Sequence, residues 1–101
     1  METTPKTTNL RALLVDDSEL DAELLVRELQ NSGYTVTHQR VDTAQAMQAA
    51  LAQAPWDLVI SDYKMPRFGG MQALELVKAS GLDLPFILVS GAVGVGRRDR
   101  A

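Results

Sequence analysis

Two apolar segments of the sequence end in aspartate. RALLVDDSE, residues 11–19, ends its apolar run at Asp16 and Asp17, and DLVISDYKMP, residues 57–66, carries Asp62 shortly before a proline. Carboxylates that lie close together raise each other's pKa unless a cation intervenes. Oxygen ligands with room for water suit Mg²⁺. A carboxylate beside bound Mg²⁺ can attack phosphorus, so these residue types predict phosphoryl transfer to an aspartate.

A serine follows a further apolar segment. Ser90 comes directly after Phe86 to Val89, and its hydroxyl could hydrogen-bond a phosphate oxygen. The candidate residues include no histidine, no cysteine and no serine beside a base, so hydrolysis would lack a proton shuttle. These residues favour a phosphorylation switch, and we expect no separate enzymatic activity.

Hydrophobic periodicity predicts strands that end at these polar residues. Strands are expected at residues 10–15, 34–41, 58–61 and 86–90. The strand at 34–41 is mixed in polarity and typical of a sheet edge. It carries His38, which we interpret as a surface residue.

Helix signals occur between the predicted strands. Ser18 is a candidate N-cap with Asp21 three residues later, and Gly33 a candidate left-handed C-cap. The next helix is capped by Asp42 or Thr43.

A further helix is expected after a loop at residues 66–70, ending at Ser80 and Gly81. Apolar stripes predict which residues of the helices are buried. The predicted stripes are Ala22, Leu25, Val26 and Leu29, then Met47, Ala50, Leu51 and Ala54, then Met71, Leu74, Val77 and Lys78.

The alternation of strands and helices predicts an α/β fold with a doubly wound parallel sheet. Helices that connect parallel strands must cover the faces of the sheet. Ligands of such sheets bind beyond the carboxyl ends of the strands. Because Asp16, Asp17, Asp62 and Ser90 all lie at the carboxyl ends of strands, the fold should gather them in one crevice.

The sequence resembles the receiver domain of two-component response regulators. The motifs that carry the resemblance are LLVDDSELDAELL, DLVISDYKMPRFGGMQAL and LPFILVSG. The resemblance itself extends over about residues 10–92. The resemblance implies a CheY-like, flavodoxin-like fold with strand order 2-1-3-4. It also implies a cytoplasmic protein that receives a phosphoryl group from a sensor histidine kinase or a phosphotransfer protein.

The resemblance further implies roles for individual residues. Asp62 would be the phosphoacceptor and a ligand of Mg²⁺. Asp17 would bind the metal directly, Asp16 mainly through a metal-bound water, and Lys64 through its backbone carbonyl. The residues that complete the site would be the phosphoryl-contacting hydroxyl of Ser90 and the loop residues Pro66 and Gly70.

The sequence departs from the family after residue 92. Family members continue with a helix, a strand that ends in a Lys-Pro pair and a last helix, whereas this sequence reads VGVGRRDRA. No residue there matches the family lysine that pairs with the phosphoryl group. We therefore expect a polar tail at residues 1–9, a C-terminally truncated receiver domain at 10–92 and an atypical Gly/Arg-rich tail at 93–101.

This departure suggests an alternative function. A strand at residues 86–90 would form an exposed apolar sheet edge, and such edges pair with other chains. We expect a homodimer in which two copies of this strand pair across a two-fold axis. The alternative to the phosphoacceptor is therefore a phosphorylation-incompetent receiver that acts as a self-associating interaction module.

Composition excludes several other classes of protein. A chain of 101 residues has room for one small domain. A net charge of −3 indicates no general attraction to nucleic acid or anionic lipid. The absence of cysteine excludes disulfides and thiolate metal sites. The polar N-terminus is not a signal peptide, and no apolar run is long enough to cross a bilayer.

Overall fold

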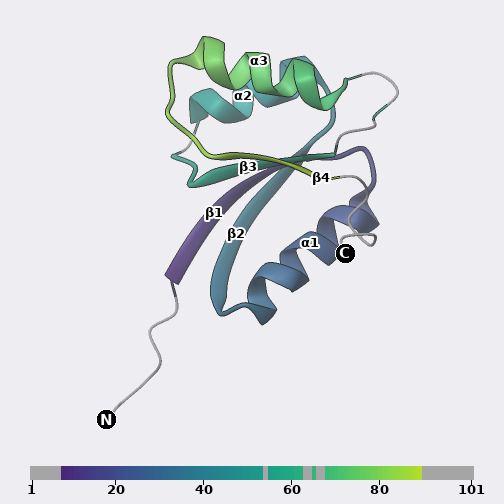
Figure 1. The fold of residues 1–101 in the computed structure, drawn as a ribbon, viewed down its shortest axis with the longest axis vertical. Helices are drawn as coiled ribbons and strands as arrows, with labels where there is room; N and C mark the ends of the chain where they lie inside the picture. Colours follow the sequence, from purple (N-terminus) through teal and green to yellow (C-terminus); the bar gives the residue numbers. More distant parts are fainter. Residues whose placement is uncertain (1–7, 54, 63–64, 66–67, 90–101) are drawn as a thin grey trace.

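The computed structural model describes residues 8–53, 55–62, 65 and 68–89. Strands and helices alternate along this part of the chain (Figure 1). Within these ranges, no helix combines the length and apolar character needed to span a membrane. The elements are β1 (Thr8–Val15), α1 (Glu19–Asn31), β2 (Tyr34–Val41), α2 (Ala44–Gln53), β3 (Leu58–Asp62), α3 (Gly70–Ser80) and β4 (Phe86–Val89).

The described strands form one parallel sheet in the order β2-β1-β3-β4. This order confirms the predicted arrangement, with β2 at one edge. Helices α2 and α3 lie together on one face of the sheet, and α1 lies against the other face (Figure 1). The protein therefore has the three-layered α/β architecture that the alternating pattern predicted.

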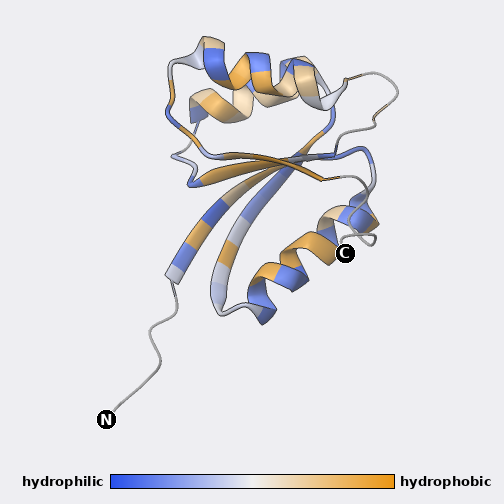
Figure 2. Ribbon diagram, in the orientation of Figure 1, coloured by the Kyte–Doolittle hydropathy of each residue, from blue (hydrophilic) through white to orange (hydrophobic). Residues whose placement is uncertain are grey.

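Alternation of side chains along β1 divides the core into two halves. Leu13 and Val15 pack on the side of α2 and α3, whereas Ala12 and Leu14 pack on the side of α1, and the side chains of all four are fully buried. Successive residues of a strand point to opposite faces, so a strand covered on both sides is apolar throughout. In Figure 2 the helices alternate between hydrophobic and hydrophilic segments, while β4 is hydrophobic along its length.

The predicted helix boundaries are largely confirmed by specific contacts. The hydroxyl of Ser18 accepts a hydrogen bond from the Asp21 N–H at 3.2 Å. The Thr43 hydroxyl accepts a hydrogen bond from the Ala46 N–H at 3.1 Å, so the side chain that caps α2 is that of Thr43 and not that of Asp42. Gly33 follows α1 with a φ of 103°, in the left-handed region that favours glycine.

Strand lengths differ slightly from the prediction. β1 begins at Thr8 rather than Leu10, because its pairing with β2 starts at Thr8 and Tyr34. β3 extends one residue beyond Ser61 and includes Asp62, which is the register partner of Val89. Backbone pairing with a neighbouring strand, which local hydrophobicity does not report, sets these ends.

The predicted buried stripe of α3 was wrong in two positions. Met71 is 56% exposed and Lys78 is exposed, while the buried residues of this helix are Gly70, Ala73 and Val77. Gly70 also belongs to the helix rather than to the preceding loop. The helix therefore packs inward with the face that carries Ala73 and Val77, and Met71 and Lys78 lie on the exposed side.

The assigned core predicts that the same substitution, leucine to alanine, has different effects at a buried and at an exposed position. Leu13→Ala removes a fully buried side chain from β1 and should lower the free energy of unfolding by about 3 kcal/mol. Leu20→Ala, at a residue of α1 that is 64% exposed, should change it by less than about 0.5 kcal/mol. Urea denaturation followed by circular dichroism measures both, and equal effects would contradict the assigned core.

Candidate metal centre

Three carboxylates converge at the carboxyl ends of β1 and β3. Asp16, Asp17 and Asp62 each offer an oxygen, and these oxygens lie within 4.8 Å of one another. Strands β1 and β3 are adjacent and parallel, with Val15 paired to Ser61, so the residues that follow meet at one edge. Asp16 and Asp62 are buried and Asp17 is exposed. The structure therefore brings the acids together as the sequence predicted.

Asp16 is held at three of its four polar atoms. Its N–H donates to the Val41 carbonyl at 3.0 Å, and its own carbonyl accepts from Nη1 of Arg40 at 3.1 Å. Its Oδ1 accepts from the Ser18 N–H at 2.9 Å. Its Oδ2 is buried and has no hydrogen-bond partner among the residues that the structure describes. A buried carboxylate oxygen without a partner costs free energy, and a bound cation would remove that cost.

The surroundings of Asp16 disfavour its ionised form. The pKa of Asp16 is raised to about 6, chiefly by burial and in addition by the negative charges of Asp62, Asp21 and Asp17. The hydrogen bond from the Ser18 N–H acts in the opposite direction. A cation among the three carboxylates would favour the ionised form, so metal binding and deprotonation of Asp16 should be coupled.

The donor set fits a hard divalent cation. All candidate ligand atoms found here are carboxylate oxygens, which suit Mg²⁺ or Ca²⁺ rather than a thiophilic metal. The exposed position of Asp17 leaves the centre open on one side, and a magnesium site keeps several water ligands. The arrangement can therefore hold a hydrated cation beside the carboxylate of Asp62.

Other predicted site residues are placed only in part. Gly70 is the first residue of α3, and Gly69 is the N-cap of this helix. Lys64, Pro66 and Ser90 lie outside the described residues, so their assignments stay predictions.

Sequence reasoning missed Arg40. This residue is the last but one in β2, and its guanidinium donates to the backbone carbonyl of Asp16, which directly follows the neighbouring strand β1. No local sequence signal identifies this contact, because it follows from the register of the parallel pair, in which Val15 lies opposite Val41. The polar character of residues 34–41 predicts an edge strand but not the contact of its final residues with the acids.

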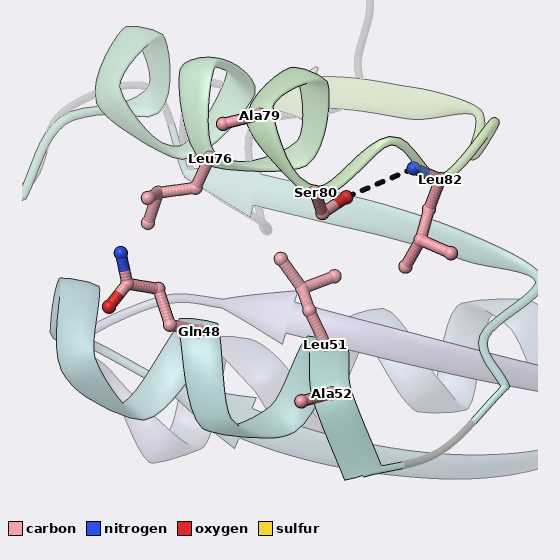
Figure 3. A pocket seen from close by; sticks show the side chains of 7 residues that line it. All are labelled: Gln48, Leu51, Ala52, Leu76, Ala79, Ser80 and Leu82. Carbon is pink, nitrogen blue, oxygen red and sulfur yellow. Dashed lines mark hydrogen bonds between the residues drawn. The ribbon is translucent and has the colours of Figure 1, made fainter.

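A separate hollow lies between α2 and α3. Its volume is about 460 Å³, and in Figure 3 side chains of both helices point into it from opposite sides, with the Ser80 hydroxyl accepting from the Leu82 N–H at 3.2 Å. No charged side chain is among its lining residues in the described part of the chain, so it offers no chemistry comparable to that of the acids. The lining residues are Gln48, Leu51, Ala52, Leu76, Ala79, Ser80 and Leu82.

The raised pKa predicts that Asp16→Asn stabilises the metal-free protein in a pH-dependent way. A carboxyl with a raised folded-state pKa supports folding when protonated and loses that contribution as the pH rises from about 4 through about 6. The free energy of unfolding of the variant should therefore exceed that of the parent by an amount on the order of 2 kcal/mol at neutral pH. Near pH 4 the two free energies of unfolding should be nearly equal. Urea denaturation in EDTA across this range measures the difference. A difference independent of pH would contradict the assignment.

Comparison with known proteins identifies relatives of this chain. The family model described as "Response regulator receiver domain" matches residues 12–100. The response regulator MprA of Mycobacterium ulcerans is 31% identical over 90 residues, which cover 89% of this chain and 38% of that protein. The chain thus spans well under half the length of this curated relative.

Solved structures agree in fold. Full-length FixJ from B. japonicum is 30% identical, with a TM-score of 0.66 over 81% of this chain and 39% of that one. The chemotaxis response regulator CheY4 of Vibrio cholerae is 29% identical, with a TM-score of 0.59 over 80% of this chain and 68% of that one. The family match over most of the chain, the shared fold and the acids at the strand ends lead to one conclusion: the chain belongs to the response regulator receiver domain family.

Proposed function

We propose that this chain is a Mg²⁺-dependent phosphoacceptor in a two-component phosphorelay, with Asp62 as the residue that is phosphorylated. Membership of the receiver family supports a role in two-component signalling. The observation that carries the finer proposal is the convergence of Asp16, Asp17 and Asp62 within 4.8 Å. The donor would be a sensor histidine kinase or a phosphotransfer protein, and the site of action the cytoplasm.

Asp62 supplies the nucleophile in this proposal. One of its carboxylate oxygens attacks the phosphorus of a phosphohistidine, a P–O bond forms and the P–N bond breaks. The electron pair of the broken bond stays on the imidazole nitrogen, which takes up a proton from water. The position of Asp62 at the end of β3, 8% exposed, keeps the acid in a fixed place beside the other carboxylates.

The other acids prepare the site for this reaction. Asp17 is the exposed acid and the proposed direct ligand, and Asp16 is the buried acid proposed to act mainly through a metal-bound water. Bound Mg²⁺ would offset the negative charge of the transferring phosphoryl group. Lys64 through its carbonyl, Ser90 through its hydroxyl and the loop residue Pro66 complete the proposed set, on the strength of the family resemblance.

Intact-mass spectrometry after incubation with acetyl phosphate and Mg²⁺ tests the proposal. The parent should gain one phosphoryl group, and Asp62→Asn should gain none because it lacks the nucleophilic oxygen. EDTA should abolish the gain in the parent, and Asp17→Asn should reduce it at least tenfold through loss of a metal ligand.

Folding must be confirmed for each variant by circular dichroism. A folded parent that gains no phosphoryl group would contradict the proposal, and an equal gain in Asp62→Asn would place the acceptor elsewhere.

One observation favours a second candidate function, that of a self-associating interaction module. Strand β4 is the outer strand of the described sheet, and its residues Ile87 and Leu88 are 44% and 39% exposed. These residues lie on opposite faces of the strand, so both faces present apolar surface near the sheet edge. An apolar edge strand is a template for pairing with a second copy of the chain.

Analytical ultracentrifugation tests this second candidate. The parent should sediment as a dimer at micromolar concentration, and Ile87→Lys should shift it to a monomer because a charge at the paired edge would be desolvated. Met71→Lys, on the exposed face of α3, should leave the dimer intact. A monomeric parent would contradict the candidate and leave the phosphoacceptor proposal unaffected.

A further inference from the structure

Arg40 joins the edge strand to the acidic centre. It lies in β2, and its Nη1 donates to the backbone carbonyl of Asp16 at 3.1 Å. The same nitrogen lies 3.6 Å from Oδ2 of Asp42. We propose that Arg40 is a positioning residue that holds the backbone of Asp16 so that the unpartnered carboxylate oxygen of Asp16 faces the metal centre. This inference rests on the proposed function, because it assumes that the acids bind Mg²⁺.

The hydrogen bonds of Asp16 explain how a contact with its backbone can orient its carboxylate. Strand β2 holds Asp16 from two directions, through the Val41 carbonyl on its N–H and through Arg40 on its carbonyl. The Ser18 N–H donates to Oδ1, so Oδ2 is the carboxylate oxygen of Asp16 that remains available to a cation. A ligand oriented by outer contacts binds a metal more tightly than one that must be ordered on binding.

Arg40 is not required by the core. Its side chain is 31% exposed, it lies on an edge strand, and its partner Asp42 is 47% exposed. The side chain therefore makes its main specific contact with the loop that carries the acids. A substitution here should leave the sheet folded and change the acidic centre alone.

Two possible roles of Arg40 predict effects of opposite sign. A guanidinium near a cation site repels the cation, so if Arg40 acted only through its charge, its removal would tighten Mg²⁺ binding. If Arg40 acts by holding the Asp16 backbone, its removal should weaken binding, because Asp16 would have to be ordered by the metal. The direction of the change therefore separates positioning from simple electrostatics.

The test combines Mg²⁺ titration with amide hydrogen exchange on the full chain. Arg40→Met should weaken Mg²⁺ binding about tenfold in isothermal titration calorimetry. In the metal-free protein, Arg40→Met should lower the protection of the Asp16 and Ser18 amides from hydrogen exchange about fivefold. The Asp16 N–H donates to Val41 and the Ser18 N–H donates to Asp16, so both hydrogen bonds depend on the position of the Asp16 backbone. The amides of Leu13 and Val59, in the centre of the sheet, should keep their protection and report an intact fold.

Two further variants serve as controls. Arg40→Lys keeps the charge and an ammonium that can donate to the Asp16 carbonyl, although without the planar guanidinium, so its Mg²⁺ affinity should fall between those of the parent and Arg40→Met. Asp42→Asn removes the ion pair but leaves the Arg40 contact with the Asp16 carbonyl, so it should bind Mg²⁺ within about twofold of the parent.

The outcomes are distinct. An Mg²⁺ affinity of Arg40→Met equal to or above that of the parent, or unchanged protection of the Asp16 and Ser18 amides, would overturn the inference. Failure of the parent to bind Mg²⁺ would instead contradict the proposed function. The exchange measurement, which needs no metal, would then decide alone whether Arg40 holds the Asp16 backbone.

Discussion

The parallel pairing of β1 with β3 is the constraint on which the rest of the structure depends. Parallel strands in register end at the same edge of a sheet, so the pairing of Val15 with Ser61 places the residues that follow β1 beside the end of β3. Without this pairing, acids more than forty positions apart in the sequence would not share a site. The helices on both faces stabilise the pairing by burying the apolar side chains of the central strands.

The acidic centre is built at some cost to the stability of the protein. Asp16 is buried, carries an oxygen without a partner and lies beside other negative charges, so its ionised form is disfavoured. A core optimised only for stability would have an apolar residue there. Unfavourable burial of this kind often marks functional sites, where a ligand supplies the missing interaction.

Much of the fold and part of the site could be predicted from the sequence, for identifiable reasons. The strands β1 and β3 are short apolar runs, and the caps at Ser18 and Thr43 are residues whose side chains bond to their own helix. Such signals are local and can be read from neighbouring letters. The prediction failed for Met71, because hydrophobicity alone does not say which face of α3 packs inward. That choice depends on the tertiary contacts of the helix, which place Ala73 and Val77 in the core.

The sequence by itself determined the order of strands and helices, the acids that end two strands and the family to which those motifs point. Tertiary structure alone decided how these acids differ from one another. It buried Asp16 and left Asp17 exposed, although the two are adjacent and chemically identical. It also brought Arg40 of the edge strand to the backbone of Asp16. Burial and hydrogen bonding depend on residues that are distant in sequence, so no local pattern could have distinguished the two aspartates or identified Arg40 as their neighbour.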